Sequence, residues 1–393
     1  MSYLKTVVIQ HIDDLRPQLT EVSRRMYHEP ELGFQEYLAS GWLAGMLKEA
    51  GFAVERGIAG MPTAFAARFP GRGPGPRLAV LAEYDALPGV GHGCGHNIIG
   101  TAAVGAALGL SLVMAGLDGE LLVLGTPAEE GAVDNAGGKV IMVEAGIFDG
   151  VDAAIMVHPS TRTTAGGTSN ARVALEMRYY GKTAHAAGAP HEGINALDAA
   201  IQTFNAWNAL RQHVKSDVRI HGIITKGGVS PNIVPDYAEI RMYVRAQDAL
   251  YLKEIEEKVK RCAEGAALAT GARVEFRYTA YTYQNMRNNR ALSRAFMANL
   301  SSLNVPVVLG ESTSGGSTDM GNVSQVVPSI HPYIAICRPG VASHSREFAD
   351  ATVAAEGENA LINAAKALAM TAIDVFTQPR LLDDARQEFT SSR

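Results

Sequence analysis

The chain contains three short apolar runs, each followed closely by acidic or histidine side chains. The runs and the polar residues behind them are 77–82 with Asp85, 121–124 with Glu129 and Glu130, and 153–157 with His158. Continuous apolar runs of this length predict buried strands, and the helical patterns between them predict a mainly parallel sheet. Ligands of open α/β sheets bind beyond the carboxyl ends of the strands. The pattern therefore predicts one site that draws on these side chains.

The polarity pattern changes after Gly166. Beyond this point the sequence predicts strands at 173–180, 238–246 and 273–283 and helices at 195–213 and 248–270. Alternating polar and apolar side chains are typical of strands with one buried face, so these segments predict a separate α+β domain. We therefore expect an α/β protein whose larger domain, 1–170 and 286–393, has a mainly parallel mixed sheet flanked by helices. A smaller α+β domain at 171–285 interrupts it.

Composition narrows the possible partners and the compartment. Hydrophobic residues make up 47% and charged residues 19% of the chain, which is typical of a globular protein. The net charge of -5 gives no reason to expect nucleic acid or an anionic membrane as a partner. Three widely separated cysteines do not form a disulfide framework, and no signal-peptide pattern is present at the N-terminus. We therefore expect a cytoplasmic protein.

Two further segments give expectations about helices. Residues 98–117 carry no charge and are long enough to span a membrane. However, the segment is rich in glycine and alanine and has no flanking basic cluster or aromatic belt, so we expect a helix buried against the sheet. Near the C-terminus, residues 351–376 predict a long alanine-rich helix, and the residues beyond Gln378 predict a polar tail.

The segment Gly93-Cys94-Gly95-His96 is the strongest chemical signal in the sequence. A thiolate and an imidazole are ligands that Zn²⁺ and similar metals prefer, and carboxylates complete such sites. The pair Glu129–Glu130 offers both a ligand and a base. Together these residues indicate metal-assisted hydrolysis.

Each of these residues also has a simpler interpretation. Cys94 alone could be a buried small apolar residue, because free cysteine is among the most buried residue types. His158 could be a strand-end histidine that is satisfied by the backbone, and the glutamate pair could be a solvated helix start. A different chemistry is a cysteine-nucleophile hydrolase that uses Cys94 and His96.

The motifs in their order along the chain resemble those of the M20 metallopeptidases and amidohydrolases. The matching segments are 92–96, the Pro-Ala-Glu-Glu run at 127–130, His158-Pro159, Gly181-Lys182-Thr183-Ala184-His185 and His344. Within the family, the chain looks most similar to the branch with aminobenzoyl-glutamate hydrolases, hippurate and auxin-conjugate hydrolases and β-alanyl dipeptidases. The resemblance implies a catalytic domain with two metal ions, interrupted by a lid domain that commonly forms a homodimer.

The resemblance also implies roles for individual residues. Cys94 would bridge two divalent ions, His96 and His158 would complete one of them, and Glu130 and His344 the other. Glu129 would be the general base. The family often has an aspartate where Asn97 stands, so we expect Asn97 to be a hydrogen-bonding residue behind the ligands, and Asp85 either supports a ligand or caps a turn.

The inserted domain carries candidates for substrate binding. His185 resembles the lid histidine that stabilises the developing oxyanion, and Asn232, between two prolines, resembles the family's substrate-binding asparagine. Arg241 or Arg245 could bind a substrate carboxylate, although a solvated strand face explains them equally well. Ser317 lies in a glycine-rich loop of the part that returns to the larger domain, where it could line the pocket.

We therefore expect a hydrolase that cleaves the amide bond of a small N-acyl or N-aminoacyl amino acid with two divalent ions. Zn²⁺ or Mn²⁺ fits the mixed ligands, and Co²⁺ or Ni²⁺ is compatible with them. One alternative is an amide or carbamate hydrolase for aromatic or xenobiotic substrates. Another alternative is a subunit that holds metal but does not catalyse a reaction. The presence of Glu129, a candidate general base, argues against it.

Overall fold

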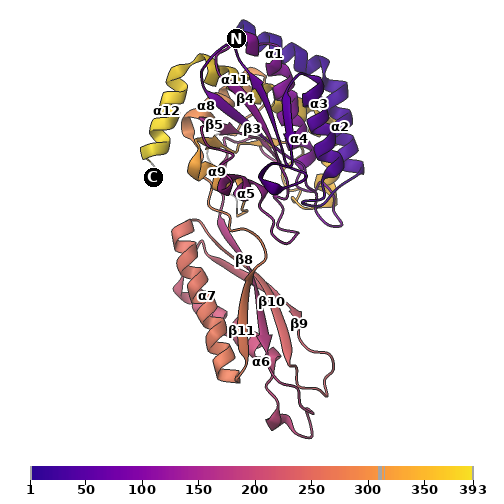
Figure 1. The fold of residues 1–393 in the computed structure, drawn as a ribbon, viewed down its shortest axis with the longest axis vertical. Helices are drawn as coiled ribbons and strands as arrows, with labels where there is room; N and C mark the ends of the chain where they lie inside the picture. The colour runs from indigo at the N-terminus through magenta and orange to yellow at the C-terminus, as the bar shows by residue number, and fades with distance from the viewer. Residues whose placement is uncertain (1, 309–311, 314, 392–393) are drawn as a thin grey trace. The chain divides into compact units, whose positions relative to one another are not determined.

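The structure, a computed structural model, describes residues 2–308, 312–313 and 315–391, and it divides into two units (Figure 1). The larger unit comprises Met1–Thr168, Met286–Gly315 and Asp319–Arg393, and the smaller unit comprises Ser169–Asn285 and Gly316–Thr318. Each unit has its own sheet and its own hydrophobic core. The smaller unit is an insertion into the larger one.

A six-stranded mixed sheet in the order β1-β2-β4-β3-β5-β13 forms the centre of the larger unit. Its strands are β1 (Ala53–Arg56), β2 (Phe65–Pro70), β3 (Arg77–Glu83), β4 (Glu120–Thr126), β5 (Ala153–Ile155) and β13 (Ser329–Ile330). The last four run parallel to one another. Strands β2 and β1 extend the sheet as an antiparallel pair beyond β4, which the sequence did not predict.

Two short strand pairs complete the sheets of the larger unit. Strand β6 (His158–Ser160) runs parallel to β14 (Tyr333–Ala335), and β7 (Gly167–Thr168) runs parallel to β12 (Ser312–Thr313). The first pair fixes the backbone around His158 directly after β5.

Helices cover both faces of the central sheet. They are α1 (Tyr3–Asp14), α2 (Arg16–His28), α3 (Tyr37–Glu49), α4 (His96–Ser111), α5 (Gly138–Glu144), α8 (Arg290–Ser302), α9 (Met320–Val326), α10 (Arg346–Ala351), α11 (Ala355–Thr377) and α12 (Pro379–Ser391). Leu78 and Val80 of β3 share a core with α1, α4 and α11, whereas Ala79 and Leu81 pack with residues of α5 and α9. Burial on both faces explains why the strands are continuously apolar.

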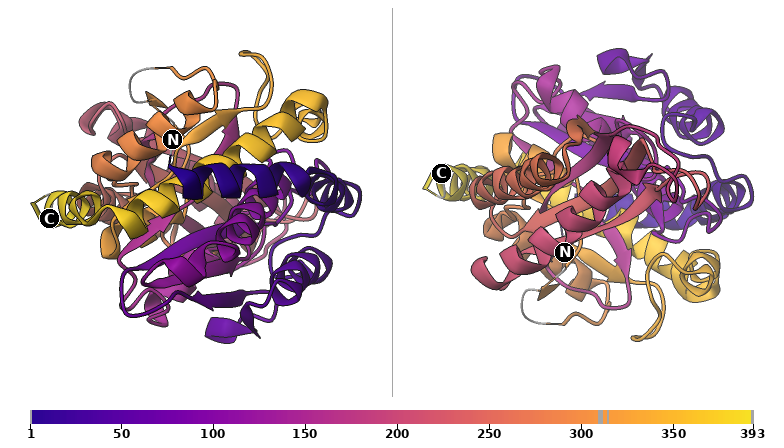
Figure 2. Two further views of the ribbon diagram at one scale, coloured as in Figure 1. Left: turned by 90° about the horizontal axis from the view of Figure 1, so that it is seen from above. Right: turned by 90° about the horizontal axis from the view of Figure 1, so that it is seen from below.

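Helices α4 and α11 form the inner layer on one face, and α1 lies beside α11 when the unit is viewed from above (Figure 2). Nearly every residue of α4 is buried, as expected for the uncharged segment. Within the described chain, α11 is the one helix long and apolar enough to cross a membrane, but 89% of its most apolar window is buried inside the protein. Both helices are therefore core helices of the larger unit.

The smaller unit is a four-stranded antiparallel sheet with two helices. The strands, in the order β11-β8-β10-β9, are β8 (Ala171–Tyr180), β9 (Arg219–Lys226), β10 (Tyr237–Ala246) and β11 (Arg273–Tyr278). Helices α6 (Ala196–Leu210) and α7 (Ala249–Thr270) share a core with the apolar residues of one sheet face. The other face carries the polar residues of the alternating strands.

Several details of the expectation were wrong. The residues beyond Gln378 form α12 instead of a polar tail, and Leu382 and Ala385 of this helix are buried. The long C-terminal helix, α11, begins at Ala355 instead of Ala351, the last strand of the insert ends at Tyr278, and β9 was not foreseen. The loop with Ser317 belongs by its contacts to the smaller unit, because Ser317 accepts a hydrogen bond from Arg245.

Candidate metal centre

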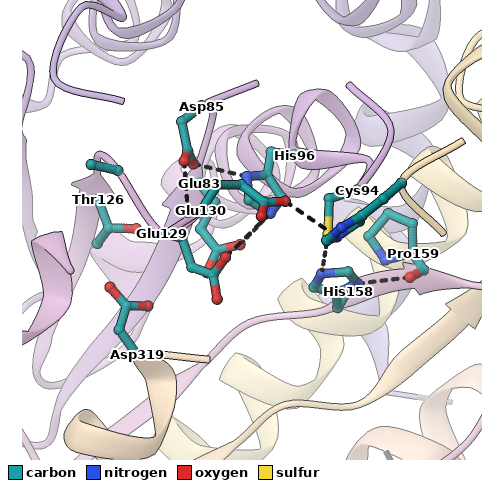
Figure 3. A network of polar contacts seen from close by, with 12 residues as sticks. Glu83, Asp85, Cys94, His96, Thr126, Glu129, Glu130, His158, Pro159 and Asp319 are labelled. Atoms are coloured by element: carbon teal, nitrogen blue, oxygen red, sulfur yellow. Dashed lines mark hydrogen bonds and ion pairs between the residues drawn. The ribbon is translucent and has the colours of Figure 1, made fainter. Parts of the chain in front are cut away.

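Polar side chains of the larger unit meet beyond the carboxyl ends of β3, β4 and β5 (Figure 3). They are Asp85 after β3, Glu129 and Glu130 after β4, His158 at the start of β6, and Cys94 and His96 at the N-terminus of α4. Both glutamates are 8% exposed, and the next helix, α5, begins only at Gly138. This geometry excludes the interpretation of the pair as a solvated helix start.

The possible ligand atoms form three overlapping groups, of which two contain Cys94 and the third comprises His96, Glu129 and Glu130. The Sγ atom of Cys94 and ring nitrogens of His96 and His158 all lie within 4.8 Å of one another, and the same is true of Cys94, Glu130 and His344. Cys94 Sγ lies 3.5 Å from His158 Nε2, and His344 Nε2 lies 3.5 Å from Glu130 Oε1. Because Cys94 belongs to two of these groups, the arrangement can hold two divalent ions with a shared thiolate.

The two glycines beside Cys94 allow loops from distant parts of the chain to approach it. A Cβ atom on Gly93 would lie 3.2 Å from the Cα atom of His344, whose backbone N–H donates to the Gly93 carbonyl at 2.8 Å. Gly95 has a φ of +82°, and a Cβ atom there would lie 2.7 Å from the Pro159 ring. The glycines are therefore needed so that the loops with His344 and His158 reach the cysteine.

Hydrogen bonds behind the candidate ligands fix their orientation. Asp85 Oδ1 lies 2.8 Å from His96 Nδ1, and its Oδ2 accepts from the backbone N–H of Glu130 at 2.9 Å. His158 Nδ1 lies 2.7 Å from the Pro159 carbonyl and donates to it, which leaves Nε2 unprotonated towards Cys94. Asp85 and Pro159 thus play the part of the outer hydrogen-bonding partners that orient ligands in metal sites.

The donor set fits a cation. Among the described residues, His96 Nε2 and Glu130 Oε1 are buried and find no hydrogen-bond partner. Buried polar atoms are rarely left in this state unless an ion or another ligand satisfies them. Burial lowers the pKa of His158 to about 3, with a further contribution from His331, so its imidazole is neutral and able to ligate at neutral pH.

The same environment argues against Cys94 as a free nucleophile. Burial raises the pKa of the Cys94 thiol well above its ordinary value, and the Glu130 carboxylate raises it further. Nucleophilic cysteines have a lowered pKa instead. A thiolate forms here when a cation displaces the proton, which couples metal binding to proton release.

A buried ionic cluster that the sequence did not reveal lies beneath Glu129. Lys139 Nζ lies 2.6 Å from Glu83 Oε1 and 2.5 Å from Asp319 Oδ1, and all three side chains are completely buried. Burial raises the pKa of Glu129 well above its ordinary value, and the carboxylates of Glu83, Glu130 and Asp319 add to this effect. A carboxyl group with a raised pKa beside a metal centre is suited to general acid–base work.

A second unforeseen residue, Glu36, positions the backbone before Glu129. Glu36 Oε1 accepts from the N–H of Ala128 at 2.9 Å, and its Oε2 accepts from the Thr63 hydroxyl at 2.8 Å. Ala128 has a φ of +54°, which is unfavourable for a residue with a side chain. The buried carboxylate therefore stabilises a strained turn at the base of the site.

The side chain of Asn97 forms hydrogen bonds with residues that lie behind the candidate ligands. Its amide donates to the Ser23 hydroxyl and to the Thr352 hydroxyl, each at 3.0 Å. The side chain therefore joins α4 to α2 and to the turn after α10, as a hydrogen-bonding residue.

Comparison with known proteins identifies the family. Residues 169–270 match a peptidase dimerisation domain of M20 type. The Xaa-Arg dipeptidase of Mus musculus is 39% identical over 405 residues, which cover 99% of this chain and 93% of the relative. The chain belongs to the M20 family of metallopeptidases and amidohydrolases.

Other M20 proteins are similar to this chain in sequence and in fold. One of the subunits of p-aminobenzoyl-glutamate hydrolase from Escherichia coli is 30% identical over 460 residues, covering 97% of this chain and 94% of that protein. A dinuclear metal-binding M20 peptidase of Bacillus subtilis has a TM-score of 0.68 at 24% identity, covering 93% of this chain and 99% of that structure. This chain is accordingly a metal-dependent hydrolase of the M20 family.

In the dimerisation domain, the loops with His185 and Asn232 are held together. The backbone N–H of Ala186 donates to the Asn232 carbonyl at 3.0 Å, and both side chains are exposed. His185 Nδ1 accepts from the N–H of Gly188 at 3.1 Å. A neutral imidazole whose Nδ1 accepts carries its proton on Nε2, so Nε2–H remains a hydrogen-bond donor.

The two candidate arginines of β10 differ in their contacts. Arg241 Nε donates to Glu176 Oε2 at 2.9 Å, and Arg178 and Arg277 bind the same carboxylate. Arg245 instead donates to the hydroxyl of Ser317 at 3.2 Å. Two residues that the sequence analysis selected independently are therefore in contact, whereas Arg241 forms part of an ionic network within the sheet.

Proposed function

We propose that this M20 enzyme hydrolyses the amide bond of a small N-acyl or N-aminoacyl amino acid, with two divalent ions bound by Cys94, His96, His158, Glu130 and His344. The observation that carries the proposal is the position of Cys94 in two overlapping ligand groups. The names of the relatives, which include a dipeptidase, an aminobenzoyl-glutamate hydrolase and an N-acetylcysteine deacetylase, support this class of substrate. The thiolate, imidazole and carboxylate ligands favour Zn²⁺ or Mn²⁺.

Two bound ions would supply Lewis-acid chemistry, which lowers the pKa of water and polarises the scissile carbonyl. Glu129 accepts the proton of the attacking water and transfers it to the leaving amine nitrogen. Burial and the neighbouring carboxylates raise the pKa of Glu129, which favours uptake of a proton by this group.

The dimerisation domain contributes the groups that recognise the substrate. His185 donates from Nε2 to the carbonyl oxygen as negative charge develops there, and the Asn232 amide assists. Arg245 binds a carboxylate of the leaving amino acid, and Ser317 orients its guanidinium.

We further propose a homodimer that forms through the smaller unit, in the cytoplasm. Strand β9 lies at the edge of its sheet, and Ile223 and Ile224 on this strand are 64% and 39% exposed. Exposed apolar edge strands are typical sites of pairing with a second chain. The three cysteines are free, which suits a reducing compartment.

The decisive test combines metal analysis with one substitution. We expect about two ions per chain, in line with the two-metal principle, and amide hydrolysis that a chelator abolishes and that Mn²⁺ or Zn²⁺ restores. Glu129→Gln should retain the metal and lose on the order of 10³-fold in kcat, because it removes the general base. Glu144→Gln, an exposed glutamate on α5, is the matched control.

The substrate panel distinguishes the alternatives. It contains N-acyl amino acids and dipeptides, each paired with the analogue whose free carboxylate is replaced by a neutral amide, together with aromatic amides and carbamates. Equal rates on acids and neutral amides would favour an enzyme for aromatic or xenobiotic amides. Full metal occupancy without turnover of any compound would favour a subunit that holds metal without catalysis.

A further inference from the structure

A pocket of about 490 Å³ lies beside α8 in the larger unit. Its walls consist of residues from one face of α8 and from the segments 165–168, 286–290 and 307–308, all of which belong to this unit. None of the described residues that line the pocket is a candidate metal ligand. Small-molecule sites have volumes of roughly 300–1,000 Å³, so the pocket is large enough for a small organic ligand.

The lining of this pocket is mainly apolar. Met297 and Ala298 of α8 line it together with Met286 and Val307 from the neighbouring segments. Val308, which also lines the pocket, is 48% exposed. Covering apolar surface that the folded chain leaves in contact with water is favourable. The pocket therefore favours a ligand with an apolar body.

Two polar side chains of the lining hold the walls of the pocket in place. Asn288 Oδ1 accepts from the backbone N–H of His331 at 3.0 Å, and Asn288 Nδ2 donates to the Gly167 carbonyl at 2.7 Å. The hydroxyl of Ser293 donates to the Ala165 carbonyl at 3.3 Å. These hydrogen bonds join α8 and the segment before it to the segment 165–168, so the shape of the pocket is fixed by the fold.

Arg294 supplies a cation to the pocket. Its side chain is exposed, and no ion pair or hydrogen bond joins its guanidinium to another residue of the described chain. Arg290 also lines the pocket, but the carboxylate of Glu388 accepts from its backbone N–H, so we consider Arg294 alone. No acidic side chain is present among the described lining residues. Guanidinium groups bind carboxylates through charge-assisted, often bidentate hydrogen bonds, so Arg294 favours an anionic head group.

The spacing of lining residues along α8 indicates the length of such a ligand. Ser301, which also lines the pocket, lies two turns beyond Arg294 on the helix. Two turns correspond to about 10 Å, which is about the length of an extended octanoate molecule. A carboxylate at Arg294 therefore places its apolar chain along Met297 and Ala298, with the end of the chain near Ser301.

We propose that this pocket, the α8 pocket, binds a monocarboxylate with an apolar chain of about the length of octanoate. Arg294 binds the carboxylate, and Met297, Ala298 and Val307 cover the chain. The inference goes beyond the proposed function and does not rest on it, because the described lining of the α8 pocket shares no residue with the candidate metal centre.

The first test is a calorimetric titration of the metal-loaded protein with octanoate. We expect saturable binding with a dissociation constant below about 1 mM, as is ordinary for a ligand of this size. The neutral octanamide should bind about tenfold more weakly, because it lacks the charge-assisted contact with Arg294. Acetate should not compete with octanoate, because it lacks the apolar chain. Octanoate binding should persist after chelation of the metal ions.

Substitutions in α8 locate the bound ligand. Arg294→Met should weaken octanoate binding about tenfold and leave octanamide binding within about twofold of the wild type. Ala298→Leu fills the pocket and should weaken the binding of both compounds. Arg380→Met, at an exposed position in α12, is the matched control and should bind octanoate as the wild type does. All three positions are exposed, so the unfolding temperature and amide hydrolysis should remain those of the wild type.

The outcomes decide between the α8 pocket and other places for the carboxylate. Absence of saturable octanoate binding would overturn the inference. Binding that is lost on chelation would place octanoate on the metal ions, and equal binding by the wild type and Arg294→Met would place it elsewhere on the surface, so either result would also overturn it. Weaker octanoate binding in both α8 variants, with octanamide binding retained in Arg294→Met, would support it. None of these readouts requires hydrolysis, so a failure of the proposed function is detected separately.

Discussion

The carboxyl group of Glu36 gives the folded protein an unusual dependence on pH. The group is completely buried, and both oxygens accept hydrogen bonds, from Ala128 N–H and from the Thr63 hydroxyl. Burial, assisted by the negative charge of Asp85, raises its pKa from 4.5 to about 7. The folded state therefore holds a proton between these two pH values that the unfolded state has released.

The sign of the effect follows from this proton. A carboxyl group whose pKa is raised on folding contributes full stability below pH 4.5, and that contribution is lost as the pH rises to about 7. At 1.36 kcal/mol per pKa unit, the difference between the two values corresponds to about 3 kcal/mol. Glu36→Gln keeps an acceptor for Ala128 and removes the ionisation, so its free energy of unfolding should lack this loss.

The assay is urea unfolding of the wild type and of Glu36→Gln at pH 5 and pH 8, with a chelator present so that metal release does not contribute. Both proteins carry Trp207→Phe, so that the fluorescence of Trp42 in α3 reports on the larger unit. Between pH 5 and pH 8, the free energy of unfolding of Glu36→Gln should increase by roughly 3 kcal/mol relative to that of the wild type. Glu49→Gln, at an exposed position in α3, is the control: its free energy of unfolding should differ from that of the wild type by the same amount at both pH values. A wild-type-to-variant difference that is the same at both pH values would refute the reasoning.

Three further predictions concern other parts of the larger unit. Lys139→Met should lower the free energy of unfolding by about 3–5 kcal/mol in urea titrations, because it leaves two buried carboxylates unpaired, and a change below about 1 kcal/mol would contradict the buried cluster. Gly95→Ala should reduce the metal content per chain measured after dialysis, because its Cβ would meet Pro159 at 2.7 Å and its φ is +82°, whereas full occupancy would show that the loop adapts. Glu388→Ala should destabilise the protein by about 1 kcal/mol in thermal unfolding, because this side chain of α12 accepts from the first N–H groups of α8, and an unchanged unfolding temperature would contradict that capping role.

The sequence predicted the parts of the site that depend on local pattern. The runs that became β3, β4 and β5 are apolar on both faces, so each was recognisable as a buried strand, and parallel strands bring their carboxyl ends to one edge. The short spacing between Cys94 and His96 placed two ligand types together without any long-range information. The charge-free segment became α4, because its glycine- and alanine-rich composition, without a flanking basic cluster or aromatic belt, describes a core helix.

The antiparallel edge and the C-terminal helix depended on tertiary contacts that no local pattern contains. Helix α12 has few apolar residues, and it is fixed by distant partners, such as Asn289, whose amide donates to the Ala385 carbonyl. Strand β2 pairs with β4, although the whole of β3 and α4 lies between these two strands in the chain. Contacts between such distant segments are not contained in a local sequence pattern, so the regular structure of β2 and α12 becomes evident only in the folded chain.

The residues that the sequence analysis did not identify are charged residues in the interior of the protein. Glu36, Lys139 and Arg172 are each within 3% of complete burial, yet a charged residue in a sequence is ordinarily a sign of a solvated surface. Lys139 is buried together with the two carboxylates that it pairs with, and Glu36 is buried with two hydrogen-bond donors. Arg172 is buried with aromatic rings and another arginine instead. Inside the protein, the cost of burial is offset for Lys139 by these carboxylates and for Glu36 by its two hydrogen bonds.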